Sequence, residues 1–235
     1  MTYELYYWTG IQGRGEFVRL ALEEAGADYV DVAREKGDGI IGKVTAESST
    51  PSFAPPFLRD GEVVIGQTAL ILHYLGPKLG LVPRDPLLRL WTHQIQLTIA
   101  DAVVEAHDTH HPIGGDLYYE EQKPEAARRA RLFRDNRVPL FLDWFETVLA
   151  RNPAGDTWLV GRKRSYADLS LFQLVEGLSY AFPRLMQRQL PGYPKVAGVC
   201  ARVAALPNIA RYLKSQRRLP PNEWDVFRHY PELDE

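Results

Sequence analysis

The stretch that decides the fold is residues 3–26, which read YELYYWTGIQGRGEFVRLALEEAG. Its first part, residues 3–8, is rich in tyrosine and tryptophan, as half-buried β-strands are. Glycines follow at positions 10, 13 and 15, and apolar residues then recur at helical spacing until Gly26 supplies a stop signal. With a second short strand over 29–32, the pattern predicts a β-α-β unit whose strands pair in parallel.

The rest of the first eighty residues predicts a loop, a hairpin and a helix. Residues 34–52 contain glycine, serine and proline and indicate a loop with one irregular helix. Residues 55–58 and 63–65 flank the turn residues Asp60 and Gly61, which is typical of a β-hairpin. A helix is expected from residue 67 onward. The predicted order of the first half is therefore β-α-β-α-β-β-α.

The second half carries no strand signal. Helical periodicity recurs in five segments, at 87–107, 124–150, 165–178, 193–206 and 207–213. Residues 81–86 contain two prolines after a glycine and resist helix continuation. We therefore expect an α/β domain over residues 1–80, a linker over 81–86 and an all-helical domain over 87–235.

Composition excludes several classes of protein. The 235 residues hold 28 basic and 30 acidic side chains, and a net charge of −2 argues against nucleic acid as a partner. The one cysteine, Cys200, excludes a disulfide framework and a Cys-rich zinc site, and it reads as a small buried apolar residue. No apolar run approaches the roughly 18 residues of a membrane span. We expect a soluble, cytoplasmic protein with no membrane partner.

Three local patterns indicate chemistry in the first domain. The glycine-rich turn leaves backbone N–H groups free at a helix start, but it lacks both the G-x-G-x-x-G spacing and a Cys-x-x-Cys pair. The Pro55-Pro56 pair precedes a strand and indicates a special turn in which a cis bond is allowed. Gln67 and Thr68 open a helix, where they either bind a carboxylate or serve only as a cap.

Taken together, these pieces resemble the cytosolic glutathione transferase family over nearly the whole chain. The resemblance is carried by four motifs in order: Tyr7-Trp8 with Gly13-Arg14-Gly15-Glu16, residues 55–61, residues 65–75, and Trp158–Gly161 leading to Ser165–Asp168. It implies a thioredoxin-like glutathione-binding domain followed by an all-helical domain. The last motif is similar to the family's capping box in a core helix.

The resemblance implies that a tyrosine activates the thiol of glutathione, as in the alpha, mu, pi and sigma classes. Tyr7 is the residue that matches this tyrosine. A phenol O–H stabilises a thiolate by donating to sulfur and stays protonated at neutral pH. The turn after Tyr7 is one residue longer than is usual in these classes, so Thr9 or backbone N–H groups stay open as alternatives. Tyr6, Trp8 and Thr9 also stay open because one sequence does not fix the strand register, and Tyr7 as a core aromatic with a satisfied hydroxyl is a further alternative.

The same resemblance implies the residues that hold glutathione, the co-substrate. They are Trp8, Arg14, Lys43, Pro55, Pro56, Gln67, Thr68 and Asp101. Pro56 matches the family's cis-proline, and Pro55 offers a carbonyl but no N–H. Asp101 matches an acidic residue that reaches glutathione from the partner subunit of a homodimer. Lys43 as a solvated side chain and Arg14 as half of a structural ion pair are the alternatives.

A histidine cluster, His107-Asp108-Thr109-His110-His111, lies outside what the resemblance explains. His107 and His111 share a helix face if the helix continues, which is the spacing of a two-histidine metal pair. Pro112 ends that helix and no further ligand is evident, so no metal is expected and a structural or helix-capping role is favoured. The resemblance also implies a pocket for a small hydrophobic electrophile, lined by Gly10, Ile11, His107 and His111.

These expectations combine into one function. The chain is expected to be a homodimeric detoxification enzyme that joins glutathione to an electrophile. A glutathione-dependent isomerase or peroxidase on the same fold is one alternative, and a non-enzymatic glutathione-binding protein is another. The segment after residue 216 either wraps the cleft or forms a surface extension.

Overall fold

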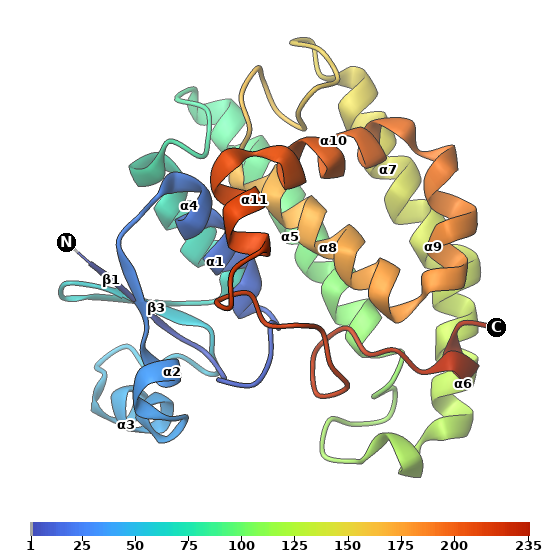
Figure 1. The fold of residues 1–235 in the computed structure, drawn as a ribbon, viewed down its shortest axis with the longest axis horizontal. Coiled ribbons are helices and arrows are strands. Elements are labelled where there is room, and N and C mark those ends of the chain that lie inside the picture. The colour runs from blue at the N-terminus through green and yellow to red at the C-terminus, as the bar shows by residue number, and fades with distance from the viewer. Residues whose placement is uncertain (1) are drawn as a thin grey trace.

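A four-stranded mixed sheet forms one end of the molecule in the computed structural model, which describes residues 2–235 (Figure 1). Its strands are β1 (Tyr3–Tyr6), β2 (Tyr29–Asp31), β3 (Phe57–Asp60) and β4 (Val63–Gly66). The strand order is β2-β1-β3-β4, in which β2 runs parallel to β1 and the other two pairs are antiparallel. The predicted β-α-β unit and hairpin are therefore confirmed.

Helices cover both faces of the sheet. One face carries α1 (Gly15–Ala25) and α4 (Thr68–Leu79), which pack on Leu5 and Leu58. The other carries α2 (Val32–Lys36) and α3 (Gly39–Glu47), which pack on Tyr6 and Phe57. Because successive side chains of a strand point to opposite faces, β1 contributes to both layers and fixes the direction in which the chain leaves the sheet at Tyr7.

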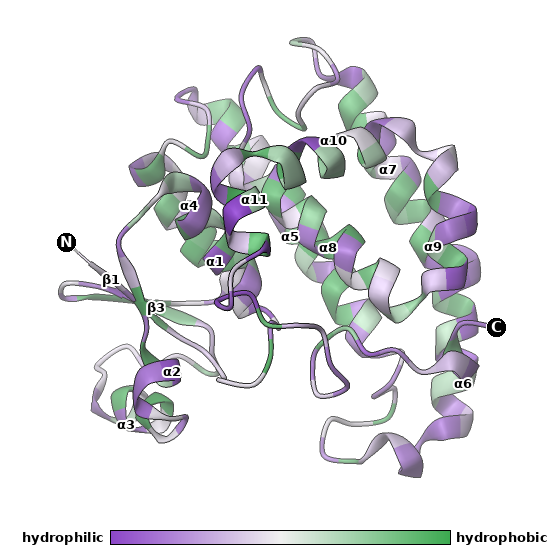
Figure 2. Ribbon diagram, viewed as in Figure 1, coloured by the Kyte–Doolittle hydropathy of each residue, from purple (hydrophilic) through white to green (hydrophobic). Residues whose placement is uncertain are grey.

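The remaining elements are helices, as predicted. They are α5 (Pro86–His107), α6 (Lys123–Leu132), α7 (Val138–Arg151), α8 (Tyr166–Ala181), α9 (Pro183–Gln189), α10 (Pro194–Ala205) and α11 (Pro207–Leu213). Helix α8 runs through the middle of this group and is buried along most of its length. Figure 2 shows green and purple segments alternating along the outer helices, which have one buried and one exposed face. The core that they share also takes in Phe17 and Leu20 of α1.

Several element boundaries differ from the prediction. Residues 34–52, expected to be loop with one irregular helix, form α2 and α3, which are separated by Gly37 at φ 81°. Gly39 and Gly42 lie inside α3 and weaken its sequence signal. The expected strand over 3–8 ends at Tyr6, so Tyr7 and Trp8 belong to the following turn. Helix α9 was not predicted, because it begins at a proline directly after α8.

The helix predicted over 124–150 is interrupted. A π-helical turn, Phe133–Arg137, separates α6 from α7. Pro139 has no N–H to donate to the preceding turn, which accounts for the loss of regular α-helical bonding at this point. Cys200 is 9% exposed, which confirms the prediction of a buried thiol, and burial raises its pKa to about 12.

The start of α8 is held by the predicted capping box. Asp168 is fully buried, and its carboxylate accepts hydrogen bonds from the backbone N–H groups of Leu159 and Ser165 and from the Ser165 hydroxyl, at 2.7 to 2.8 Å. Burial raises the pKa of Asp168 to about 6, although these donors act in the opposite direction. No helix among residues 2–235 is both long and apolar enough to cross a membrane.

We expect Asp168→Ala to lower the free energy of unfolding by about 3 kcal/mol or more, because it leaves buried N–H donors without an acceptor. Urea unfolding followed by circular dichroism measures the change. Asp116→Ala removes the same side chain from an exposed loop position and is the matched control. Equal stability of the two variants would contradict the role given to the capping box.

Candidate active site

Tyr7 lies in the turn between β1 and α1, directly after the strand. Its side chain is buried, and its hydroxyl oxygen accepts a hydrogen bond from the Arg14 backbone N–H at 2.9 Å. Within residues 2–235 the hydroxyl proton has no acceptor, so it stays free to donate. Burial raises the pKa of Tyr7, with the Arg14 N–H acting in the opposite direction, and the phenol is protonated at neutral pH.

Two glycines make room for this tyrosine. A Cβ atom on Gly13 would lie 2.0 Å from the Tyr7 hydroxyl oxygen, and one on Gly15 would lie 2.6 Å from its ring. Gly13 also has a φ of 48°, in the left-handed region that favours glycine. The glycines at 13 and 15 thus allow the turn to close over the Tyr7 ring.

The other polar side chains near the end of β1 already have partners or face away. The Tyr6 hydroxyl donates to Glu4 at 2.8 Å, on the far face of the sheet from α1. The Thr9 hydroxyl and backbone N–H both bind Asp38. Trp8 is 41% exposed. Among these residues, Tyr7 alone combines a buried hydroxyl with an uncommitted proton.

The Pro55–Pro56 bond is cis, as expected. In the antiparallel register Tyr6 lies opposite Phe57, so the proline pair lies beside the chain at Tyr7. Pro56 is buried, whereas Pro55 is only partly buried. The structure therefore brings the proline pair and Tyr7 to the same edge of the sheet.

A cavity of about 370 Å³ lies between α1, α4 and α5, and it brings together three of the predicted residues, Arg14, Gln67 and Thr68. Gln67 has a φ of 67°, a strained conformation for a residue other than glycine that costs about 1 kcal/mol or more. The Thr68 hydroxyl donates to the Arg14 carbonyl at 3.3 Å and does not cap α4. The capping-only interpretation of Thr68 is therefore wrong.

Gln96 of α5 lines the same cavity and was not predicted. Its side chain is 1% exposed, and its Oε1 atom has no hydrogen-bond partner within residues 2–235. Arg14 makes no ion pair with any described residue, so the structural ion-pair alternative is not supported. The cavity thus presents a guanidinium, a hydroxyl and an unpaired amide oxygen to a ligand.

Lys43 and Asp101 lie outside this cavity. Lys43 is exposed on α3, and Asp101 is exposed on α5. Within this single chain neither residue contacts the cavity, and neither has an ion-pair partner in the part that the structure describes. Any role for them depends on a ligand or a second subunit.

The histidine cluster lies at the end of α5, close enough to Arg14 for its charge to act on His107. The rings of His107, His110 and His111 pack on one another with centroids 4.7 to 5.1 Å apart. Burial lowers the pKa of His111 to about 4 and that of His110 to about 2, and it also lowers the pKa of His107. None of the three rings bonds to a carbonyl of α5; the rings contact one another, Asp108 and the Val226 carbonyl instead.

The segment after α11 runs back across the turn between β1 and α1 (Figure 1). Asp225 is buried, and its carboxylate accepts hydrogen bonds from the backbone N–H groups of Gln12 and Gly13 at 3.0 and 2.8 Å. Asn222 donates to the Gly10 carbonyl at 2.8 Å. Burial raises the pKa of Asp225, with the backbone donors acting in the opposite direction. The backbone of the turn that carries Tyr7 is thus bound by side chains of the segment after α11.

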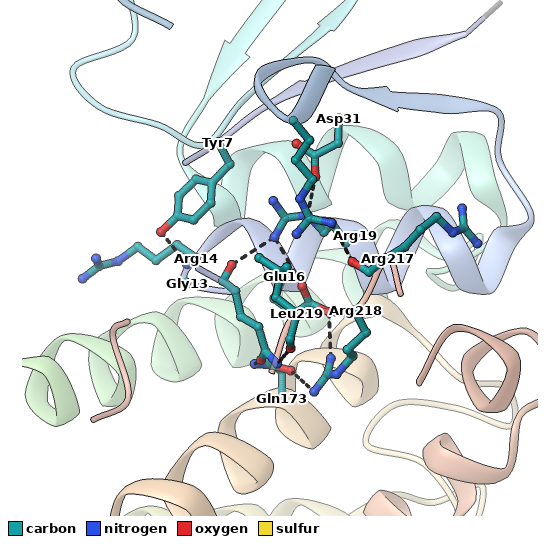
Figure 3. A network of polar contacts seen from close by, with 12 residues as sticks. Tyr7, Gly13, Arg14, Glu16, Arg19, Asp31, Gln173, Arg217, Arg218 and Leu219 are labelled. Atoms are coloured by element: carbon teal, nitrogen blue, oxygen red, sulfur yellow. Dashed lines mark hydrogen bonds and ion pairs between the residues drawn. The ribbon is translucent and has the colours of Figure 1, made fainter. Parts of the chain in front are cut away.

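A buried polar network supports this turn from below (Figure 3). Arg19 of α1 donates to Asp31 at 2.6 Å and to the Gln12 carbonyl at 3.1 Å, and it pairs with Glu16 at 3.3 Å. Glu16 also binds Arg218 of the C-terminal segment at 2.7 Å. Burial lowers the pKa of Arg19, but Glu16 and Asp31 raise it by more, so the guanidinium stays charged.

Comparisons with known proteins agree with this architecture. The family model described as "Glutathione S-transferase, C-terminal domain" matches residues 107–216. The chain is 28% identical to glutathione S-transferase P 1 of Xenopus laevis, covering 92% of this chain and 93% of that protein. It is 27% identical to glutathione S-transferase A1 of Bos taurus, with 93% and 92% covered. The pi-class glutathione S-transferase of Onchocerca volvulus superposes with a TM-score of 0.71 at 22% identity, over 94% of this chain and 98% of that one.

Residues 107–216 thus match the glutathione S-transferase C-terminal domain, and the chain as a whole is similar to glutathione S-transferases. The resemblance that its motifs indicate is confirmed, and so is its fold class, a thioredoxin-like first half followed by helices. Members of the glutathione S-transferase family use glutathione as a substrate. The two candidate places for glutathione in this chain are the edge of the sheet at Tyr7 and the cavity lined by Arg14.

We expect Gly13→Ala to lower the free energy of unfolding by about 2 kcal/mol or more, because a Cβ at this position overlaps the Tyr7 hydroxyl and strains a left-handed residue. Gly10→Ala is the control, since its Cβ would meet nothing within 4 Å. Denaturant unfolding of both variants measures the difference. If Gly13→Ala were as stable as Gly10→Ala, the tight packing of the turn on Tyr7 would be refuted.

Proposed function

We propose that this protein is a glutathione transferase of the tyrosine type, in which Tyr7 activates the thiol of glutathione. The observation that carries the proposal is the buried Tyr7 hydroxyl, which keeps an uncommitted proton beside the cis Pro55–Pro56 bond. A phenol in this state donates to a neighbouring sulfur without losing its proton. The proposal divides the chain into three parts. Residues 1–80 form the domain that holds glutathione, residues 81–86 connect the two domains, and residues 87–235 form the domain that holds the electrophile.

Glutathione is an anionic tripeptide, and the residues around the turn offer groups for each of its parts. Gln67, Thr68 and Arg14 suit the γ-glutamyl carboxylate, since they combine a hydroxyl, an amide and a guanidinium at the start of α4. The Pro55 carbonyl accepts from the cysteinyl N–H. Lys43 and Trp8, both exposed, close over the glycyl end.

The chemistry requires a thiolate at neutral pH. A free thiol has a pKa of about 8.5, so a hydrogen bond from Tyr7 and the nearby Arg14 charge both favour loss of its proton to solvent. The thiolate then attacks an electrophilic carbon. A carbon–sulfur bond forms as a leaving group departs with its electron pair, or as the electrons of an activated double bond move to the neighbouring atom.

The electrophile is proposed to bind beside the C-terminal segment. A cavity of about 450 Å³ opens there, and its lining combines aromatic residues with His111, Arg228 and the carboxylates of Asp116, Glu120 and Glu223. Its aromatic lining includes Tyr118, Trp224 and Tyr230. Gly10 and Ile11 lie on the turn that this segment covers, and His107 stacks on His111. A small hydrophobic substrate suits such a surface.

We expect Tyr7→Phe to raise the thiol pKa of bound glutathione by about 1 to 2 pH units, because one charge-assisted hydrogen bond to sulfur is lost. The ultraviolet absorbance of the thiolate, titrated against pH, measures the shift. Turnover of a chlorinated aromatic substrate should fall in parallel at neutral pH.

Tyr6→Phe is the matched control for this titration. Tyr6 is equally buried and its hydroxyl is committed to Glu4, so its removal should leave the thiol pKa unchanged. A Tyr7→Phe enzyme with an unaltered thiol pKa would reject Tyr7 as the activating residue. Bound glutathione with the pKa of free thiol in the unmodified protein would reject the transferase proposal itself.

The protein is further proposed to act in the cytoplasm, in detoxification, as a homodimer. Support for the dimer comes from an apolar stripe along α5: Leu90, Leu97 and Val104 recur every seven residues and are 63%, 48% and 46% exposed. Leu70 of α4, which is 49% exposed, lines the same cavity as Leu97 and Val104 and extends this surface. Asp101 lies on the same face of α5, one turn from Leu97, where it would reach the partner's glutathione.

We expect Leu97→Glu to convert the dimer to a monomer, because it places a charge in the apolar stripe. Sedimentation velocity measures the state of assembly. Leu140→Glu, a change at a similarly exposed leucine of α7, should leave the dimer intact. A monomeric unmodified protein, or a dimer that survives Leu97→Glu, would be evidence against this interface.

A further inference from the structure

The three histidines at the end of α5 pack on one another more closely than a role in lining the electrophile cavity requires. One ring nitrogen from each of His107, His110 and His111 lies within 4.8 Å of the other two. We propose that these side chains bind a divalent transition-metal ion of the Zn²⁺ type, with one ring nitrogen from each histidine. The proposal is independent of the role given to Tyr7.

The contacts of His110 fix which of its nitrogens is available. Its ring is 1% exposed, and its Nε2 atom lies 2.9 Å from the Val226 carbonyl oxygen. A carbonyl can only accept, so Nε2 carries the proton and Nδ1 presents a bare lone pair. Histidines that bind metals are usually oriented in this way, by a carbonyl or carboxylate on the opposite nitrogen.

His107 has a comparable second partner. Its Nδ1 atom lies 3.3 Å from the Asp108 carboxylate, which orients the ring and leaves Nε2 for another partner. His111 faces His110, with their Nδ1 atoms 2.5 Å apart. These atoms share one proton at most, so the space between the rings is lined by unprotonated nitrogen.

The spacing matches a metal site after small rotations of the rings. Zn²⁺ binds imidazole nitrogen at about 2.0 to 2.1 Å, and tetrahedral geometry separates two such nitrogens by about 3.3 Å. The 2.5 Å pair must therefore open slightly and the wider pairs must close. Three histidines with a fourth position left open is an arrangement that Zn²⁺ adopts in proteins, and imidazole also suits Cu²⁺ and Ni²⁺.

Access and charge set the expected strength of binding. His111 lines the cavity of about 450 Å³, which gives an ion a path from solvent and space for a water molecule as fourth ligand. The charge of Arg228 acts on all three histidines and that of Arg14 on His107, whereas Asp108 offers a negative charge. Because both guanidinium groups repel a cation, we expect the affinity of this site for a divalent ion to be lower than that of a three-histidine site without nearby positive charge.

Isothermal titration of the full chain with ZnSO₄, after treatment with a chelator, tests the proposal. We expect saturable binding of one Zn²⁺ per chain. Either His107→Asn or His111→Asn should weaken binding at least tenfold, and Asp108→Asn should weaken it less. His107 and His111 are partly exposed, so their variants are expected to fold, and circular dichroism checks this.

The double variant His73→Asn/His93→Asn is the matched control, because these residues form the other contacting histidine pair, with centroids 4.5 Å apart. It should bind Zn²⁺ as the unmodified protein does. A second readout needs no variant: Zn²⁺ should protect the 107–111 peptide from diethylpyrocarbonate, as followed by mass spectrometry. The proposal would be overturned if the unmodified protein did not bind one Zn²⁺ per chain. It would also be overturned if the His107→Asn and His111→Asn variants bound Zn²⁺ as tightly as the unmodified protein, or if Zn²⁺ left the histidines open to diethylpyrocarbonate.

Discussion

The ion pair between Arg19 and Glu16, on successive turns of α1, is the contact on which the arrangement of the two halves depends. Both side chains are fully buried, and neither could stay charged there without partners. Those partners come from β2 through Asp31, from the β1–α1 turn through the Gln12 carbonyl, from α11 through Tyr212 and from the C-terminal segment through Arg218. Each contact fixes one element relative to α1. Loss of a partner would leave a buried polar atom of this pair without its hydrogen bond, so the elements are constrained together.

The turn around Tyr7 is therefore held by groups far from it in the chain. Asp225 binds its backbone N–H groups, and Gln173 of α8 bonds to the Gln12 side chain at 2.9 Å. Phe227 packs so closely on Gly177 that a Cβ there would lie 2.3 Å from its ring. The position of the Tyr7 hydroxyl thus depends on the helical half as well as on the sheet, because a rigid site needs supporting contacts around it.

Local patterns in the sequence were enough to predict the β-α-β unit, the hairpin and the helical second half, because each is encoded by residues near one another. The capping box at Asp168 was predicted from the resemblance of residues 158–168 to the glutathione transferase family. The π-helical turn before Pro139 was not predictable, since periodicity alone does not separate it from a continuous α-helix. Glycines inside α3 concealed that helix in the same way.

The parts of the site that sequence reasoning missed depend on distant contacts. Asp225 accepts hydrogen bonds from Gln12 and Gly13, which precede it by 213 and 212 positions in the sequence. No local pattern marks it as a partner of the turn. Gln96 is one of several polar residues on α5, and only the cavity singles it out. The third histidine, His110, was visible in the sequence, but its orientation depends on the Val226 carbonyl. Candidate residues were thus easier to predict than the contacts that position them.

The place of the C-terminal segment also bears on how the chain is made. A ribosome synthesises Asp225 more than two hundred residues after the turn around Tyr7. Until then the N–H groups of Gln12 and Gly13 have no carboxylate to bind, and Glu16 lacks Arg218. The pocket around Tyr7 therefore takes its final shape only after the segment that carries Asp225 and Arg218 has left the exit tunnel. A nascent or prematurely terminated chain would therefore hold the tyrosine in an unfinished pocket.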